Sequence, residues 1–133
     1  MAMPEIISTP EAAPPAGAYS QAVAVGDLVF CAGVTPNRPD GTPVEGDFEE
    51  QARAAFANLD AIARAAGCTL DDAIRVGVYL RDSSKFYEMD RLFAEYFSGA
   101  KPARTTIPVE LDGMEIELDA VLYRHARTSE VRS

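Results

Sequence analysis

Two short runs near the start of the chain, residues 20–25 and 28–34, consist mainly of apolar residues. Short apolar runs bounded by turn residues are typical of β-strands. Only Gly26-Asp27 separates the two runs, and this dipeptide suits a tight hairpin turn. Before them, residues 10–18 contain three prolines and one glycine. We expect that stretch to be irregular, because proline cannot donate to a backbone ladder.

Two later segments have the three- and four-residue spacing of amphipathic helices. The first begins after Asp47, whose spacing from Glu50 is that of a capping box, and ends before Gly67. The second extends from about residue 83 to residue 97 and is followed by Gly99. The apolar stripes are Ala52, Ala55, Phe56, Leu59, Ile62, Ala63 and Ala66 in the first helix, and Phe86, Met89, Phe93 and Tyr96 or Phe97 in the second.

Three further strands are predicted at residues 73–80, 103–109 and 114–123, the last after a turn at Asp112-Gly113. The order strands, helix, strand, helix, strands indicates an α+β domain with one sheet. Two helices cannot cover both faces of a sheet of about six strands, so we expect both on one face. The other face is then solvated or covered by a partner subunit.

Alternation within these strands predicts which residues occupy the open face. Residues 114–122 place Glu117 and Asp119 there, opposite an apolar row of Met114, Ile116, Leu118, Ala120 and Leu122. In the same way, the open-face residues of the other two strands are Arg75, Gly77, Tyr79, Arg104 and Thr106, with Ile74, Val76, Val78 and Leu80 on the apolar face. A face that mixes acids, arginines and tyrosines is too polar for a core. It favours a ligand or a partner subunit at this surface.

Composition narrows the classes of function. The 133 residues fit one domain, 1–133, with residues 126–133 as a loose tail. Twelve basic and twenty-one acidic residues give a net charge of −9, which argues against nucleic acid as a partner. An anion that binds this protein must therefore contact an individual arginine or lysine side chain. Two cysteines and one histidine, without CxxC spacing, predict no metal site.

Nothing at the start of the chain has the basic-then-apolar pattern of a signal peptide. No apolar run approaches the ~20 residues that cross a bilayer. We therefore expect a cytoplasmic protein with no membrane partner.

Four residues are candidates for chemistry. A guanidinium such as that of Arg104 can grip a carboxylate in two parallel hydrogen bonds, although a structural ion pair with a neighbouring acid is the alternative. Glu117 or Asp119 could position a water molecule, or could be a solvated strand acid. Tyr19 could close a pocket or anchor its loop. In contrast, Cys31 is expected to be a buried structural thiol.

Four segments, in order, resemble the RidA/YjgF family over roughly residues 4–124. Gly17-Ala18-Tyr19-Ser20-Gln21-Ala22 is close to G-P-Y-S-Q-A, and Phe30-Cys31-Ala32-Gly33-Val34-Thr35-Pro36 is similar to a strand ending in S-G-Q-x-P. The third segment runs from Glu50-Gln51-Ala52-Arg53 through Asn58-Leu59 to Gly67. The fourth is Pro102-Ala103-Arg104-Thr105-Thr106 with Glu115-Ile116-Glu117-Leu118-Asp119-Ala120.

This resemblance implies a chorismate-mutase-like fold, a homotrimer whose sheets form a central barrel, and pockets between adjacent subunits. It implies hydrolysis of small imines or enamines, such as 2-iminopropanoate, to 2-oxo acids and ammonia without a cofactor. By the same resemblance, Arg104 binds the substrate carboxylate, Thr106 offers its backbone carbonyl to the water, and Asp119 holds that water. Tyr19, Ala32 and Gly33 would line the pocket.

The chain also departs from the family pattern. Asp119 stands for the usual Glu, Ala32 for Ser, Val34 for Gln, and Asp90 for a helix Asn that often contacts the site. These changes imply a drier pocket and a shifted substrate preference. An alternative function is a non-catalytic, regulatory or chaperone-like trimer that binds small carboxylates, because Arg104 would grip a carboxylate in either case.

Overall fold

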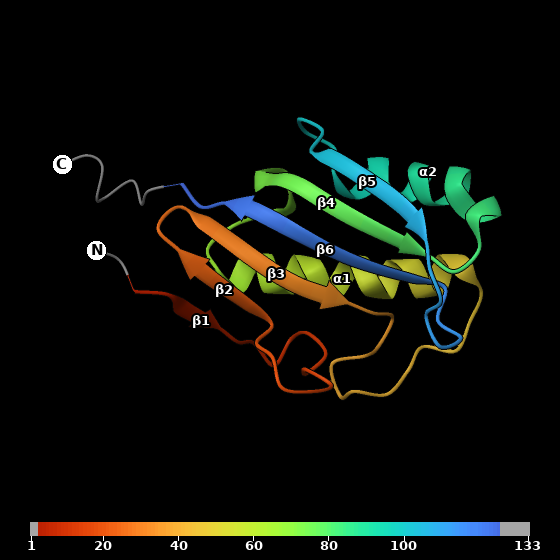
Figure 1. Cartoon of the computed structure of the whole chain (residues 1–133), viewed down its shortest axis with the longest axis horizontal. Helices are drawn as coiled ribbons and strands as arrows, with labels where there is room; N and C mark the ends of the chain where they lie inside the picture. The colour runs from red at the N-terminus through yellow and green to blue at the C-terminus, as the bar shows by residue number, and fades with distance from the viewer. Residues whose placement is uncertain (1–2, 126–133) are drawn as a thin grey trace.

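The computed structural model describes residues 3–125, which form one six-stranded sheet with two α-helices (Figure 1). The predicted tail at 126–133 lies outside the described residues. The elements in chain order are β1 (Glu5–Ile7), β2 (Ala22–Val25), β3 (Leu28–Val34), α1 (Phe48–Ala65), β4 (Ala73–Leu80), α2 (Phe86–Tyr96), β5 (Ala103–Pro108) and β6 (Ile116–Tyr123).

The sheet has the strand order β1-β2-β3-β6-β4-β5. Every neighbouring pair is antiparallel except β4 and β5, which are parallel. Both helices lie behind the sheet in the view of Figure 1, so the other face is open. This confirms the predicted α+β class, with a single mixed sheet and both helices on one face. None of the described helices is long and apolar enough to span a membrane.

The predicted helix and turn signals are confirmed. Asp47 accepts a hydrogen bond from the Glu50 backbone at 2.9 Å, and the Glu50 carboxylate accepts one from the Asp47 backbone at 3.0 Å. The chain leaves α1 through Gly67, whose φ of 82° lies in the left-handed region that glycine adopts without strain. A first turn of 3₁₀-helix, Ser83–Lys85, precedes α2. Thus the second predicted helix is shorter as an α-helix than its pattern indicated.

The core lies between the sheet and the helices. From β6, Ile116, Leu118, Ala120 and Leu122 are buried, as the alternation predicted. Phe56 of α1 stacks on Tyr96 with ring centroids 4.5 Å apart, and it meets Phe93 edge-on at 6.2 Å. These ring contacts join α1 to α2, so the two helices form one layer over the sheet.

The prediction for Ile74 was wrong, since its side chain is 48% exposed. Ala73 pairs with Leu122 and Arg75 with the adjacent Val121, so one extra residue sits in β4 at this point. Such a β-bulge breaks the period of two and turns Ile74 out of the apolar row. The strand β1 was not predicted either, because three residues are too few to show a period.

The predicted face of β5 was also wrong. The strand pairs in parallel with β4, so that Arg104 lies beside Val76 and Thr106 beside Val78. Side chains of directly paired residues point to the same face of a sheet. Val76 and Val78 are fully buried under the helices. Arg104 and Thr106 therefore face α2 and not the open face.

Candidate functional site

A bulge in β3 shapes the first group of candidate residues. Cys31 pairs with Ala120 and Val34 with Leu118, which leaves both Ala32 and Gly33 opposite the single residue between them in β6. Bulges of this kind are common beside active sites, where they redirect the chain. Here the bulge brings the backbone of Gly33 against the side chain of Glu117.

Glu117 is a partly buried carboxylate with a raised pKa. Burial raises the pKa first, and the neighbouring charge of Asp119 raises it further. Among the residues that the structure describes, no donor forms a hydrogen bond with either Glu117 oxygen. The carboxylate is therefore available to a water molecule or a ligand.

Asp119 occupies the open face of β6 as predicted, but its oxygens are engaged. Oδ1 accepts a hydrogen bond from the Gly77 backbone at 3.1 Å, and Oδ2 accepts one from the Tyr79 hydroxyl at 2.9 Å. That hydrogen bond is the main cause of a raised pKa at Tyr79. The arrangement holds Asp119 in place as a fixed negative charge next to Glu117.

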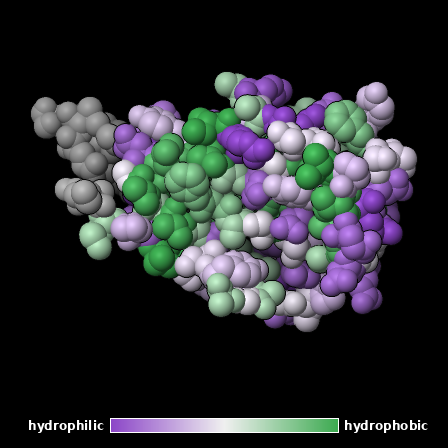
Figure 2. Space-filling model, in the orientation of Figure 1, coloured by the Kyte–Doolittle hydropathy of each residue, from purple (hydrophilic) through white to green (hydrophobic). Residues whose placement is uncertain are grey.

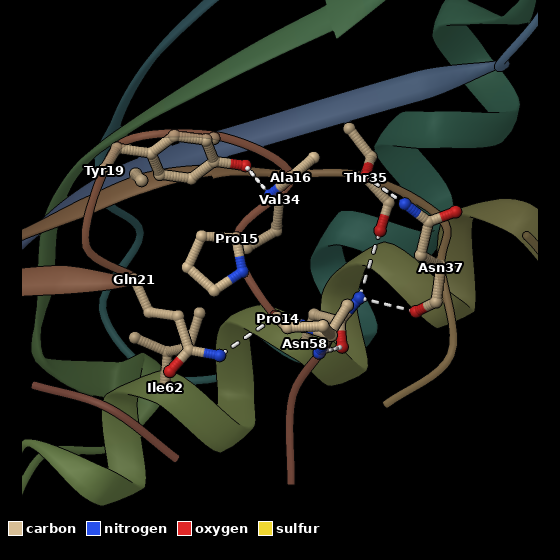
Figure 3. Close-up of a pocket in the computed structure, with 13 residues that line it drawn as sticks. Pro14, Pro15, Ala16, Tyr19, Gln21, Val34, Thr35, Asn37, Asn58 and Ile62 are labelled. Carbon is tan, nitrogen blue, oxygen red and sulfur yellow. Dashed lines mark hydrogen bonds between the residues drawn. The ribbon is translucent and has the colours of Figure 1, made fainter. Parts of the chain in front are cut away.

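Tyr19, Ala32 and Gly33 line one pocket, which Figure 3 shows in close-up. The pocket lies between the irregular segment before β2, the end of β3 and helix α1. The Tyr19 hydroxyl accepts a hydrogen bond from the Ala16 backbone at 3.0 Å, while half of the residue remains exposed. Tyr19 therefore both anchors its own loop and borders the pocket.

Two buried amides hold this pocket together, and sequence reasoning assigned them no role. Gln21 donates to the Ala13 carbonyl at 2.9 Å. Asn58 donates to the carbonyls of Thr35 and Asn37 at 3.0 and 2.8 Å and accepts from the Ala13 backbone at 3.0 Å. The sequence does contain a signal for Asn58, because an Asn inside the apolar stripe of a helix needs buried hydrogen-bond partners. These amides tie the segment before β2 to the loop after β3 (Figure 3).

Arg104 belongs to a second, separate group of residues. Its Nη1 donates to Oδ1 of Asp90 on α2 at 2.8 Å. The guanidinium carbon lies 4.7 Å from the Phe93 ring centroid and 5.4 Å from that of Phe86. Within the described part of the chain, Nε and Nη2 donate no hydrogen bond. The Nη1 side of the guanidinium is therefore fixed by Asp90, and the edge formed by Nε and Nη2 is open to a hollow. This hollow is lined by Asp90, Phe93, Ala94, Lys101, Pro102 and Arg104.

Thr106 lies on the same side of β5 as Arg104. Its hydroxyl oxygen is buried and has no hydrogen-bond partner among residues 3–125. Because β5 is the last strand of the sheet, the outer edge of its backbone is not paired within the chain. The backbone carbonyl that the family resemblance implicates is thus at a sheet edge.

One chain does not bring the two groups together, so the expectation that Arg104, Thr106 and Asp119 share a face was wrong. Strand β4 lies between β6, which carries Asp119, and β5, which carries Arg104 and Thr106. Two strand spacings amount to roughly 10 Å, and the two groups of side chains face opposite sides of the sheet. The physical reason is the parallel register of β5, which alternation within one strand cannot reveal.

The remaining polar groups do not indicate a second chemistry. Cys31 is buried as predicted, and burial raises the pKa of its thiol to about 12. An inert thiol results, because the thiolate is the reactive form. Within residues 3–125, no group of three or more His, Cys, Asp and Glu side chains is placed so that it could hold a metal ion.

Comparison with known proteins gives a consistent result. The sequence profile of the family described as "Endoribonuclease L-PSP" matches residues 9–123. A RutC family protein of Pyrococcus horikoshii is 42% identical over 125 residues, which cover 92% of this chain and 99% of that protein. A protein of Dermatophagoides farinae named "2-iminobutanoate/2-iminopropanoate deaminase" is 36% identical, over 82% of this chain and 86% of its own length.

Solved structures are similar as well. RidA from an Antarctic Psychrobacter superposes with a TM-score of 0.85 at 34% identity, covering 90% of this chain and 98% of that one. E. coli TdcF, solved with bound serine, superposes with a TM-score of 0.83 at 30% identity, covering 91% and 99% of the two chains.

Proposed function

The chain belongs to the endoribonuclease L-PSP family, which is the RidA/YjgF family, and we propose that it is a deaminase of small imino acids. The proposed reaction is hydrolysis of a 2-imino acid or its enamine to a 2-oxo acid and ammonia. One relative is named for this reaction, the deaminase of Dermatophagoides farinae. One observation carries the proposal: the guanidinium of Arg104 is held by Asp90 through Nη1, and its Nε and Nη2 donors remain open beside a hollow.

Arg104 suits the substrate carboxylate for a geometric reason. Asp90 and the two phenylalanine rings fix the plane of the guanidinium, and its free edge presents two donors. Two parallel hydrogen bonds orient a carboxylate as well as bind it. The adjacent C=N carbon of the substrate would then have a defined position, which lowers the cost of bringing water to it.

We assign the hydrolytic water to Glu117, and to Asp119 the role of a positioning residue. The oxygens of Asp119 already accept hydrogen bonds, whereas those of Glu117 accept none within the described residues. Water adds its oxygen to the C=N carbon, and the carboxylate accepts the proton as the bond forms. The carboxylate passes this proton to nitrogen, which gives a carbinolamine with one hydroxyl and one amino group. It then accepts the hydroxyl proton and passes it to nitrogen as the C–N bond breaks, so both protons of water leave with ammonia and a C=O group remains.

The proposed site needs two subunits. Arg104 and Glu117 belong to groups that lie on opposite faces of the sheet of one chain, and a neighbouring subunit can supply the missing half. The open face supports such an assembly, because Figure 2 shows a hydrophobic patch over β1–β3 and the end of β6. Its largest exposed side chains are Ile6, Val25, Phe30 and Tyr123. We propose the homotrimer that the family resemblance implies.

Two other functions are distinguishable. A non-catalytic trimer that binds small carboxylates would use Arg104 in the same way and would need no water. The family description names a ribonuclease, but a net charge of −9 disfavours binding of a polyanion.

An ammonia-release assay tests the proposal. An amino-acid oxidase generates 2-iminopropanoate continuously, and the protein should accelerate ammonia release above the spontaneous rate. Binding of a carboxylate such as pyruvate should depend on Arg104, as the reaction itself should. Binding of pyruvate without acceleration would assign the protein to the non-catalytic class.

A further inference from the structure

The hollow beside Arg104 contains three charged side chains. Arg104 and Lys101 are cations, and Asp90 is an anion. Within the hollow of one chain, two positive charges therefore face one negative charge, and a single positive charge remains. This balance matches a ligand with one carboxylate.

Asp90 lies at the mouth of the hollow. Its side chain is 52% exposed, whereas that of Arg104 is 20% exposed. Only Oδ1 of Asp90 takes part in the ion pair, and Oδ2 accepts no hydrogen bond from the described residues. The carboxylate thus orients the arginine with one oxygen and presents negative charge to the entrance with the other.

Lys101 contributes its charge to the hollow but forms no ion pair with Asp90. Its Nζ donates to the Phe97 carbonyl at 2.7 Å, where it caps the C-terminal end of α2. The ammonium group is therefore held at the helix end, while Asp90 remains the anion in contact with the arginine that binds the substrate.

We propose that Asp90 is a specificity-determining residue that admits imino acids with one carboxylate and a neutral side chain and rejects dicarboxylic ones. The inference rests on the proposed function, because it assumes that Arg104 receives the substrate carboxylate. A single carboxylate on the free edge of Arg104 neutralises the surplus charge. A second carboxylate on the same small molecule would meet the charge of Asp90 in a partly desolvated hollow, where like charges repel.

The substitution Asp90→Asn isolates the charge. Asparagine keeps an oxygen that can accept from Nη1 of Arg104, so the guanidinium keeps its orientation. We compare the variant with the wild type on imines generated from alanine and from aspartate by amino-acid oxidases. The ratio of kcat/KM for the dicarboxylic imine to that for 2-iminopropanoate should rise about tenfold in Asp90→Asn, which corresponds to loss of one moderate charge repulsion.

Two matched variants complete the test. Asp90→Glu keeps the charge and should keep the wild-type preference. Glu88→Gln removes one charge from the same helix, where Glu88 lies 4.0 Å from Lys85 and outside the hollow, and it should leave the ratio unchanged. An equal rise in the Glu88→Gln variant would show a general effect of net charge and overturn the proposal.

Binding of propionate and succinate separates this inference from the proposed function. If imines are not hydrolysed but the wild type binds propionate in preference to succinate, and Asp90→Asn removes that preference, the deaminase proposal fails and the role of Asp90 stands. If hydrolysis is observed and Asp90→Asn changes neither the kcat/KM ratio nor the binding preference, Asp90 does not select and this inference fails alone.

Discussion

The carboxylate of Glu117 lies directly over the backbone of Gly33. A Cβ atom at Gly33 would clash with Oε2 of Glu117, although the backbone of Gly33 does not have a positive φ. The glycine therefore leaves room for this position of the Glu117 carboxylate, and its backbone conformation does not itself demand a glycine. Its place in the β3 bulge makes this close approach a consequence of the strand register.

Gly33→Ala should reduce turnover by displacing Glu117. We expect kcat/KM for 2-iminopropanoate to fall roughly 10- to 100-fold, at most the lower end of the contribution of a positioned acid–base group, because Glu117 is displaced and not removed. The melting temperature should change little, because alanine tolerates this backbone. In a Glu117→Gln background, Gly33→Ala should add almost no further loss. A full additional loss there would mean that Gly33 acts independently of Glu117.

The rate should depend on pH through Glu117. Its pKa is raised by burial and by Asp119, so kcat/KM should decline on acidification at a pH above the ordinary glutamate range. Asp119→Asn removes the second cause and should move the midpoint of the pH profile downward. An unchanged midpoint would contradict the coupling between the two acids.

Glu117 should also make stability depend on pH. A carboxyl group whose pKa is raised in the folded state stabilises the fold below its unfolded pKa of about 4.3. That contribution is lost as the pH rises through the raised folded pKa. Glu117→Gln should therefore melt at a higher temperature than the wild type at pH 7, and the difference should disappear near pH 4. Scanning calorimetry at both pH values tests the sign.

Substitutions at Arg104 should separate charge from packing. Arg104→Ala should weaken carboxylate binding by about 2–5 kcal/mol, and Arg104→Lys should recover little of it. The free energy of unfolding should also fall by roughly 1 kcal/mol, because the guanidinium packs on Phe86 and Phe93. Arg104→Met keeps an apolar side chain over the rings and should retain most stability without binding. Calorimetric binding of pyruvate and thermal melts measure both effects.

Mixed trimers should restore activity if the site is shared between subunits. Arg104→Ala and Glu117→Gln proteins should each be inactive alone. After unfolding and refolding of an equal mixture, about a quarter of the sites should combine an intact Arg104 with an intact Glu117 from the neighbouring chain. The activity should therefore reach about a quarter of the wild-type rate, and no recovery would place the site within one subunit.

The assembly itself can be tested at the open face. Phe30 is 48% exposed and lies beside Val23 and Val121 of the adjacent strands. Phe30→Glu should dissociate the trimer in sedimentation experiments, because charge in a buried apolar interface is costly. Tyr87→Glu is the control, because Tyr87 is 82% exposed on α2, on the other side of the sheet.

The sequence by itself determined the elements of this protein. Short apolar runs and periods of two residues located five strands, and periods of three to four residues located both helices, because burial of one face dictates where apolar residues recur. The capping pair at Asp47 and Glu50 and the left-handed Gly67 fixed the ends of α1 through contacts between near neighbours. Short motifs in a fixed order were enough to identify the family.

Only the tertiary structure decided which residues face each other. Alternation shows that Arg104 and Thr106 share a face, but the parallel pairing with β4 decides that this face lies under α2. Likewise, the bulge in β3, and not the sequence motif, places the backbone of Gly33 against the side chain of Glu117. Asp119 instead accepts hydrogen bonds from Tyr79 and Gly77. Strand register is set by pairing between segments far apart in the chain, and a shift of one residue moves a side chain to the opposite face.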